Sequence, residues 1–564
     1  MTETVAIDVS RIKGRRGPRT KPKGRAVDSV ALGEVRALLG NEPRRRDLLI
    51  EHLHRIQDAY GSLSAQHLAA LAQEMRLAMT EVYEVATFYH HFDVVKEGET
   101  PPPPITVRVC ETLSCQIAGA ERLRAALEKF QGKDVRIVGA PCIGRCEQAP
   151  AAVVGRHSVD HATPERIAGL LRTQQIEADL PAAIGYAAYR EAGGYATLRS
   201  CVNGMMNVES VMTTLEDSAL RGLGGAGFPA GRKWKIVRGE PGPRLMAVNI
   251  DEGEPGTFKD RYYLERDPHR FIEGMLIAAW AVGIDDIYVY LRDEYAGCRT
   301  LLTHELAALA ANPPCPLPSI HLRRGAGAYI CGEESAMIES IEGKRGMPRL
   351  RPPYVAQVGL FGRPTLEHNM ETLYWIRDII EKGASWFADQ GRHGRKGLRS
   401  FSVSGRVKNP GVHLAPAGIT VRELIAEYCG GMQDGHALYA YLPGGASGGI
   451  LPASLGDIPL DFDTLQPHGC FIGSAAVIIL SQHDRARDAA LNLMRFFADE
   501  SCGQCTPCRV GTEKAVGLMA KPKWDAALLN DLSQAMADAS ICGLGQAAPN
   551  PIACVFKYFP DEVK

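Results

Sequence analysis

Four cysteines near the C-terminal end of the chain have the spacing of an iron–sulfur ligand set. They form a C-x2-C-x2-C run followed by one distant cysteine: Cys502, Cys505, Cys508 and Cys542. Three thiolates on one tight turn can hold three corners of a cubane, and a fourth is supplied from elsewhere in the fold. The pattern predicts a [4Fe-4S] cluster and an electron carrier. A structural zinc site is the alternative, although zinc usually takes its cysteines as two C-x2-C pairs.

Four other cysteines, earlier in the chain, follow two predicted strands. Residues 105–109 and 135–138 are predicted to be strands, and a C-x4-C pair and a C-x3-C pair come directly after them: Cys110, Cys115, Cys142 and Cys146. Loops at the C-terminal ends of neighbouring strands lie side by side, so the four thiolates are expected to converge on a [2Fe-2S] centre. A structural zinc site is again the alternative.

Three glycine-rich loops could bind a nucleotide. Residues 222–229 match G-x-G-x-x-G, although residues 208–220 before them are predicted to be helical, which is not the usual dinucleotide context. Residues 249–256 and 325–334 each follow a predicted strand. Glycines let backbone N–H groups approach a phosphate, and acidic side chains accept hydrogen bonds from ribose hydroxyls while repelling a 2′-phosphate. The loops predict a pocket that prefers NAD to NADP, with solvated turns as the alternative.

Composition limits the remaining possibilities. The chain has 564 residues, 45% of them hydrophobic, which is enough for several packed domains. Its 64 basic and 65 acidic residues leave no net field that would favour nucleic acid or an anionic membrane. The longest apolar stretches, such as residues 470–480, are shorter than the about 20 residues that span a bilayer, so no membrane insertion is expected. Fifteen cysteines without an export signal indicate metal ligands and buried thiols in a cytoplasmic protein.

The elements that must position these residues change in character along the chain. The pattern predicts a basic tail, a helical bundle, a small α/β domain, a larger α/β unit, a region of short strands, and a terminal helical domain: residues 1–30, 32–92, 105–180, 185–398, 400–480 and 484–564. Both cysteine sets and all three glycine-rich loops lie within these predicted domains.

The motifs together resemble known proteins. The two cysteine pairs, after a bundle that contains the VATFY sequence of residues 85–89, are similar to the thioredoxin-like [2Fe-2S] subunit of respiratory NADH dehydrogenases. The glycine-rich loops, residues 342–345 and 348–353, and the C-terminal cysteine run resemble the flavin-binding, NADH-oxidising subunit of bacterial complex I. One chain that fuses both modules is similar to the β (diaphorase) subunit of cytoplasmic, molybdenum- or tungsten-dependent, NAD-linked formate dehydrogenases.

The resemblance implies a multidomain α/β and α+β fold. Its parts would be a basic flexible tail, a helical bundle, a thioredoxin-like [2Fe-2S] domain, a Rossmann-like FMN and NAD(H)-binding domain, a ubiquitin-like β-grasp domain, and a helical [4Fe-4S] domain: residues 1–30, 31–104, 105–180, 181–398, 399–482 and 483–564.

The resemblance also implies contacts by position. The FMN contacts would be Gly222, Gly224, Gly225, Lys233, Asn249, Asp251, Glu252, Tyr329, Gly332, Glu333 and Asn369. The NAD(H) contacts would be Phe228, Lys233, Glu254 and Glu334. The chain departs from the family at His368, where an asparagine is usual, and at Ile236, Arg351 and Tyr354. Hydride transfer to a flavin requires no acid–base side chain, so Glu254 and Glu334 are expected to orient the nucleotide.

The function implied is that of a diaphorase, which moves electrons between iron–sulfur clusters and NAD+ through FMN. If the chain serves a formate dehydrogenase, formate is oxidised on a partner α subunit that carries a Mo or W pterin cofactor and further clusters. The [4Fe-4S] cluster is expected to be the nearest one-electron partner of the flavin. The first alternative is the diaphorase subunit of an NAD-reducing hydrogenase or NADH:quinone oxidoreductase. The second is a structural or scaffold protein that binds zinc.

Overall fold

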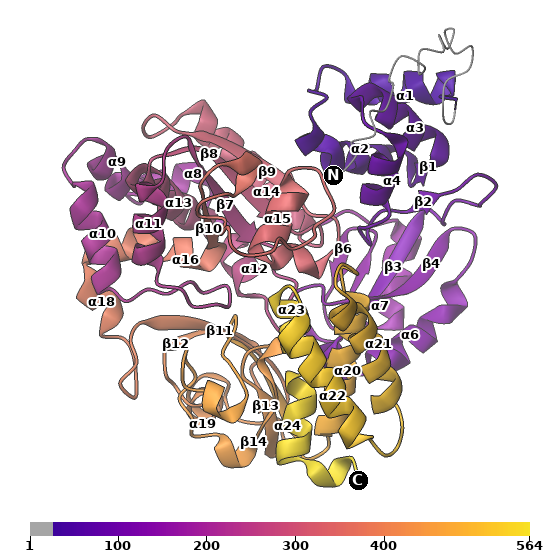
Figure 1. Cartoon of the computed structure of the whole chain (residues 1–564), viewed down its shortest axis with the longest axis vertical. Helices are drawn as coiled ribbons and strands as arrows, with labels where there is room; N and C mark the ends of the chain where they lie inside the picture. The colour runs from indigo at the N-terminus through magenta and orange to yellow at the C-terminus, as the bar shows by residue number, and fades with distance from the viewer. Residues whose placement is uncertain (1–25) are drawn as a thin grey trace, which may run out of the picture.

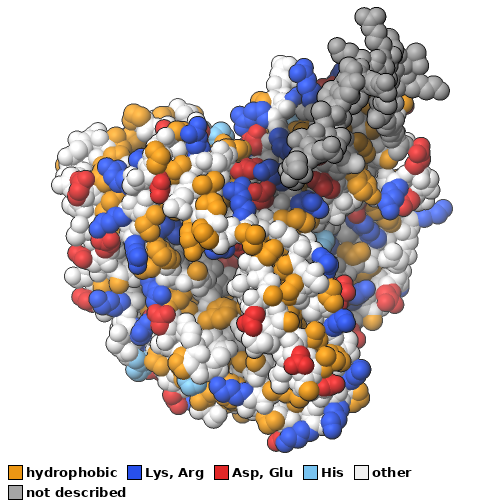
Figure 2. Space-filling view, viewed as in Figure 1, with side chains coloured by type: hydrophobic (Ala, Val, Ile, Leu, Met, Phe, Trp, Pro, Cys, Tyr) orange, Lys and Arg blue, Asp and Glu red, His pale blue; other side chains and the backbone are white. Residues whose placement is uncertain are grey.

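The computed structural model describes residues 26–564, so most of the predicted basic tail lies outside the described residues. An N-terminal helical bundle occupies the upper right of Figure 1, a large α/β lobe the left, a sheet-containing lobe the lower left, and the C-terminal helices the lower centre. Acidic and basic side chains are interspersed over the face in Figure 2. No helix in the described part of the chain is long and apolar enough to cross a membrane.

The predicted helical bundle is present. Its helices pack through a fully buried row of Val35, Leu53 and Leu71. The Asp28 side chain accepts hydrogen bonds from two backbone N–H groups of the first turn and so fixes where the bundle begins. The four helices are α1 (Ser29–Leu39), α2 (Leu49–Tyr60), α3 (Ala65–Met75) and α4 (Met79–Ala86). Two short strands of this region, β1 (Leu63–Ser64) and β2 (Val94–Val95), pair in parallel.

The second domain is a four-stranded sheet in the order β4-β3-β5-β6. Its strands and helices are β3 (Ile105–Cys110), β4 (Val135–Ala140), β5 (Ala152–Val154), β6 (His157–Val159), α5 (Leu113–Ile117), α6 (Ala120–Leu127) and α7 (Pro164–Thr173). The first two of these strands are parallel neighbours. Their C-terminal ends therefore meet at one edge of the sheet, as the sequence predicted for the two cysteine pairs.

The large lobe contains a parallel sheet in the order β10-β7-β8-β9. Its strands are β7 (Arg244–Ile250), β8 (Ile284–Leu291), β9 (Ser319–Arg324) and β10 (Thr365–Asn369). Chain order reverses between β7 and β10, and ligands of open parallel sheets bind outside the carboxyl ends of the strands at such a switch point.

Helices cover this sheet and form much of its buried core. They are α8 (Tyr186–Glu191), α9 (Ala196–Val202), α10 (Val208–Asp217), α11 (Ala230–Gly239), α12 (Lys259–Leu264), α13 (Pro268–Val282), α14 (Ala296–Ala311), α15 (Glu334–Ile341), α16 (Met370–Tyr374), α17 (Ile376–Lys382) and α18 (Ala384–Ala388). As predicted, the first glycine-rich loop follows a helix, α10.

The lower-left lobe is a mixed five-stranded sheet in the order β12-β11-β15-β13-β14. Its elements are β11 (Leu398–Gly405), β12 (Gly411–Pro416), α19 (Val421–Glu423), β13 (Leu438–Leu442), β14 (Leu451–Pro452) and β15 (Ala476–Ser481). The outer two strands at each edge are antiparallel partners, while β11 and β15 run parallel in the middle. This β-grasp-like arrangement confirms the predicted strand-rich region.

The C-terminal region is helical, as predicted. Its helices are α20 (Ala486–Asp499), α21 (Thr506–Met519), α22 (Ala526–Ala539), α23 (Gly543–Ala547) and α24 (Asn550–Tyr558). One buried apolar cluster joins this region to the β-grasp-like sheet, to α15 and to the N-terminal bundle. These parts of the chain thus share one continuous core.

Candidate functional site

A cavity of about 1050 Å³ opens at the switch point of the parallel sheet. Loops of the β-grasp-like sheet and of the C-terminal helices complete its walls. All of the residues predicted to contact FMN or NAD(H) line it: Gly222, Gly224, Gly225, Phe228, Lys233, Asn249, Asp251, Glu252, Glu254, Tyr329, Gly332, Glu333, Glu334 and Asn369. The three glycine-rich loops, distant in sequence, therefore form one site.

The glycine loop is shaped for close approach of a ligand to the backbone. A Cβ at Gly224 would lie 2.8 Å from the Asn369 Cβ, so no larger residue fits there. Gly225 has a φ of +146°, which side-chain-bearing residues rarely adopt, and a Cβ there would meet no atom within 4 Å. The open side of the loop gives a phosphate or a ring direct access to the backbone.

Asp251 supplies an unpaired polar atom to the cavity. Its Oδ2 is buried without a hydrogen-bond partner, and burial raises its pKa well above the usual range. The neighbouring Asn249 is held in place by a 2.9 Å hydrogen bond from its Nδ2 to the Gly332 carbonyl. A buried polar atom without a partner is costly, and the hydroxyl of a bound ribityl or ribose chain would provide one. This site fits FMN and a nicotinamide nucleotide by its size, its backbone access and this free oxygen.

Glu254 lies in the cavity but is already bound on both oxygens. Ser447 donates to Oε1 from its backbone N at 2.8 Å and from its hydroxyl at 2.7 Å, and the Tyr329 hydroxyl donates to Oε2. Burial raises the pKa of Glu254, while these hydrogen bonds favour the ionised form. If Glu254 binds a nucleotide hydroxyl, as predicted, that hydroxyl must share or replace one of these partners.

Glu333 and Glu334 are both paired with Arg351. Glu333 caps helix α15 through 3.0 and 2.9 Å hydrogen bonds from backbone N–H groups, and its other oxygen accepts from the guanidinium. Arg351 also lies 2.9 Å from Glu334 Oε1. Burial, and then the neighbouring Glu367, raise the pKa of Glu334. The negative charge expected to exclude NADPH is thus partly compensated by a residue at which the chain departs from the family.

The sequence interpretation missed the buried charges beneath the cavity. Lys259 is 1% exposed and lies 2.8 Å from Asp260 Oδ1 and 3.1 Å from Glu371 Oε2. Burial lowers the pKa of Lys259, but the nearby carboxylates outweigh it and the net shift is upward. Lys233, predicted to lie near the phosphate or the flavin, is 3.1 Å from Glu367 Oε2. The only available signal was a charged run that directly follows the second glycine-rich loop.

The structure also places His368, a departure from the family, beside the cavity. Its Nε2 accepts a 2.9 Å hydrogen bond from the Trp234 indole, and its Nδ1 is buried without a partner. Burial and the charge of Lys233 hold its pKa well below the usual range. His368 is therefore a neutral core side chain packed between β10 and α11.

The first cysteine set is gathered at the edge of the small sheet, and all four thiols are buried: Cys110, Cys115, Cys142 and Cys146. The Cys142 and Cys146 sulfurs are 3.3 Å apart. The thiol of Cys110 and then burial raise the pKa of Cys142 to about 12, so the site favours the thiolate only when a cation lies close to the sulfur. Arg292 donates a 2.7 Å hydrogen bond to the Cys142 carbonyl, which anchors this loop on the large lobe.

The second cysteine set frames the start of α21 and the turn before α23: Cys502, Cys505, Cys508 and Cys542. A Cβ at Gly545 would lie 2.9 Å from the Cys508 Cβ, so the two segments are in close contact. Cys542 also lines the large cavity. In the described part of the chain, no group of three or more His, Cys, Asp or Glu side chains has a geometry that could hold a metal ion.

Four family models match successive parts of the chain. They are the thioredoxin-like [2Fe-2S] ferredoxin over residues 35–175, the Nuo51 FMN-binding domain over 215–378, the SLBB domain over 400–451, and the NADH-ubiquinone oxidoreductase-F iron–sulfur binding region over 488–564. The F 2 subunit of the NADH-quinone oxidoreductase of Rhizobium meliloti is 38% identical in an alignment of 399 positions that covers 68% of this chain and 94% of that protein. The chain belongs to the family of NADH-quinone oxidoreductase F subunits.

Two further comparisons are informative, and the second of them covers nearly the whole chain. The NADH-quinone oxidoreductase F subunit of Aquifex aeolicus is 41% identical over 66% of this chain and 89% of its own length. A crystal structure of an NAD+-reducing [NiFe]-hydrogenase in the H2-reduced state contains a chain of TM-score 0.81 and 30% identity, matched over 93% of this chain and 94% of that one. The fused architecture is therefore shared with a protein outside the quinone oxidoreductase relatives.

Membership of this family confirms several predictions. The chain is an NADH-oxidising flavoprotein subunit of the complex I family, with an FMN-binding domain and domains for a [2Fe-2S] and a [4Fe-4S] cluster. The predicted multidomain fold is confirmed as well. The matched domains are iron–sulfur domains, which favours iron over zinc as the metal of this chain. The roles of individual residues and the formate specificity remain predictions.

Proposed function

We propose that this chain is the NAD+-reducing subunit of a formate dehydrogenase, in which a partner subunit with a Mo or W pterin cofactor oxidises formate. The observation that carries the electron-transfer part is Cys542, which lines the same cavity as the glycine-rich loops. A nucleotide site and a cluster ligand that share one cavity suit a protein that takes two electrons as a hydride and passes them on one at a time. FMN, when bound, supplies the step between the two. The fusion of both modules in one chain supports the diaphorase role.

The chain's own residues hold and orient the reactants in this proposal. The backbone of the Gly222 loop would hold the flavin, and Asp251 Oδ2 would accept a hydrogen bond from a hydroxyl of the flavin's side chain. Phe228, 38% exposed at the cavity mouth, packs on the nucleotide. Lys233, fixed by Glu367, balances phosphate charge. The predicted cysteine sets and the predicted domain division are part of the same proposal.

The identity of the donor is tested on the native complex. We expect the co-purifying subunit to contain Mo or W, and formate to drive NAD+ reduction that is lost when this chain is removed. Metal analysis and an NADH absorbance assay with formate or H2 as donor measure this. A complex that contains nickel, uses H2 and is inert to formate would instead establish the hydrogenase role, which the structural likeness to the hydrogenase chain supports.

Glu334→Gln is expected to relax discrimination against NADPH only modestly. The variant removes a negative charge near the nucleotide, but Arg351 already compensates part of it, so we expect a gain of about 1 kcal/mol, or about fivefold, in the NADPH to NADH ratio of kcat/KM. Steady-state diaphorase assays with both nucleotides measure the ratio. Glu381→Gln, an exposed glutamate on α17, is the matched control and should leave it unchanged. An unaltered ratio in the Glu334 variant would remove this residue from nucleotide selection.

A further inference from the structure

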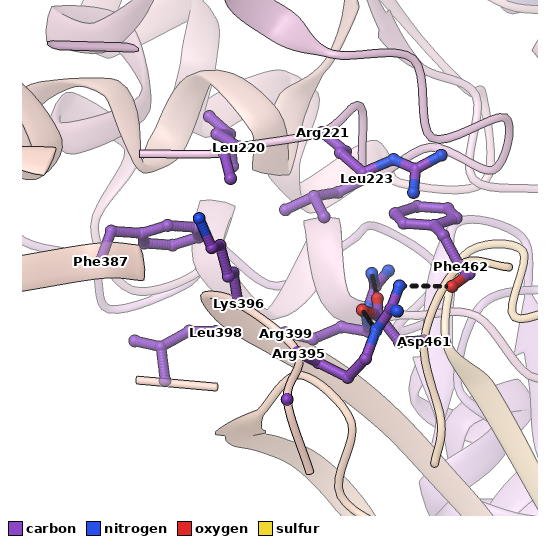
Figure 3. Close-up of a pocket in the computed structure, with 12 residues that line it drawn as sticks. Leu220, Arg221, Leu223, Phe387, Arg395, Lys396, Leu398, Arg399, Asp461 and Phe462 are labelled. Atoms are coloured by element: carbon purple, nitrogen blue, oxygen red, sulfur yellow. Dashed lines mark hydrogen bonds and ion pairs between the residues drawn. The ribbon is translucent and has the colours of Figure 1, made fainter. Parts of the chain in front are cut away.

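A second cavity of about 240 Å³ lies behind the glycine loop. Figure 3 shows its side chains, which come from the segment after helix α10, from Phe387 of α18, from the loop before β11 and the start of that strand, and from the loop around Asp461. Arg221 and Phe462 line both this cavity and the large one. The two cavities are thus adjacent and share these two side chains.

The lining of this second cavity is strongly cationic. Four of its side chains are basic and one is acidic: Arg221, Arg395, Lys396, Arg399 and Asp461. Asp461 pairs with two of the arginines: its Oδ2 is 2.7 Å from Arg395 Nε, and its Oδ1 is 2.6 Å from Arg399 Nη2. One carboxylate therefore compensates two guanidinium groups, and the cavity keeps an excess of positive charge.

Arg399 is the most constrained of these cations. It is 4% exposed, and its Nε is buried without a hydrogen-bond partner. Burial lowers the pKa of Arg399, which reflects the cost of keeping this charge away from water. Its guanidinium carbon lies 4.2 Å from the centroid of the Phe462 ring, and that of Arg221 lies 4.4 Å from the same centroid. The aromatic ring supports both cations but supplies no hydrogen-bond acceptor.

The remaining two cations lie apart from each other: in Figure 3 the Arg221 guanidinium lies over the Phe462 ring, and the Lys396 ammonium lies beside Phe387. Arg221 is paired at 2.6 Å with Asp463, an exposed residue, so water screens that pair. Lys396 is exposed and, among the described residues, has no ion-pair or hydrogen-bond partner. The site thus combines a buried unpaired donor, two partly compensated guanidinium groups and one free ammonium group.

We propose that this cavity binds a phosphate-like oxyanion, either free phosphate or the phosphoryl group of a small metabolite. Guanidinium groups match the oxygens of a phosphate in a bidentate manner, and Lys396 adds a point charge at the open side. Pockets for drug-sized ligands measure about 300–1,000 Å³, so the smaller volume here selects an ion or a short phosphomonoester over a nucleotide. The proposal does not depend on the identity of the electron donor.

The position of the site connects it with the flavin loop. Arg221 donates from Nε to the Gly227 carbonyl, and a Cβ at Gly227 would lie 2.5 Å from the Phe462 ring. An anion held by Arg221 and Arg399 would therefore lie against the residues that support the glycine loop.

Titration calorimetry tests the proposal on the FMN-loaded protein, with the nucleotide site filled by saturating NAD+ and the ionic strength held constant with chloride. We expect saturable binding of inorganic phosphate that Lys396→Glu weakens at least about tenfold, because the variant removes a charge-assisted hydrogen bond and puts a repulsive charge in its place. Lys396→Gln, which adds no repulsion, should weaken it less. Lys523→Glu, an equal charge change at an exposed lysine on the C-terminal domain, should have no effect.

A second compound in the same calorimetric experiment defines the class of ligand. Glycerol 3-phosphate in place of phosphate shows whether the site accepts a phosphoryl group on a carbon chain, and binding of either compound supports the proposal. Absence of saturable binding of both compounds would overturn it. Equal weakening by Lys396→Glu and Lys523→Glu would overturn it as well, since the effect would then follow net charge and not this cavity.

Discussion

Cys505→Ala is expected to abolish electron exchange between this chain and its partner subunits while NADH oxidation by an artificial acceptor continues. Residues that only support a metal ligand contribute about 10–100-fold to metal affinity, so loss of a direct ligand should reduce partner-dependent NAD+ reduction by at least about 100-fold. Reduction of ferricyanide by NADH should remain, because all of the residues predicted to contact FMN and NAD(H) belong to the large lobe. Both assays, together with the electron paramagnetic resonance signal of the reduced cluster, measure the effect.

The matched control is Cys315→Ala, which removes a thiol that belongs to neither cysteine set. It should leave both activities and the cluster signal intact. Full partner-dependent activity in the Cys505 variant would refute its role as a ligand. Loss of both activities in that variant would show that the C-terminal domain is needed to form the flavin cavity itself.

Lys259→Met is expected to destabilise the flavin-binding lobe strongly. The change removes the cation and leaves Asp260 and Glu371 as neighbouring buried carboxylates. Breaking a buried ion pair in this way costs about 3–5 kcal/mol. For a lobe of this size, that cost corresponds to a fall of about 6–20 °C in the midpoint of thermal unfolding. Because a chain with several domains does not unfold in one step, release of FMN fluorescence on heating is the appropriate measure.

Two variants check the cause of that loss. Lys235→Met makes the same substitution at a half-exposed lysine on α11 and should shift the midpoint little, since surface ion pairs contribute about 0–1 kcal/mol. The double variant Lys259→Met/Glu371→Gln removes one of the uncompensated charges and should recover part of the stability. A midpoint for Lys259→Met equal to that of Lys235→Met would show that these carboxylates are neutral in the folded protein.

The site residues that could be predicted from sequence are those at the ends of neighbouring parallel strands, because the sheet brings these ends together. Cys110 and Cys142 each come at the end of a strand, and parallel strands bring their ends to one edge, so their convergence was predictable. The same reasoning brought Asn249 to the cavity, because it lies at the end of a central strand. In these cases a local pattern and one rule of sheet geometry were sufficient.

The charges beneath the cavity could not be found in this way. Lys259 and Asp260 are adjacent polar residues, which ordinarily indicate a solvated turn, and only tertiary packing buries them with Glu371. The pairing of Glu254 with Ser447 crosses from one lobe to another over 193 residues. Such contacts depend on how separate parts of the chain dock, and the sequence contains no local signal of that docking.

The docking of the first cysteine loop has a consequence for how electrons could travel. Arg292 binds the Cys142 carbonyl, and Cys142 and Cys146 pack in one small apolar cluster with Phe258 of the large lobe. The second cysteine set belongs to the continuous core that also contains α15. Neither set can move away from the large lobe without breaking buried packing. We therefore expect the chain to act as a fixed tunnelling path, whose turnover does not slow as solvent viscosity rises, and not as a carrier that shuttles between positions.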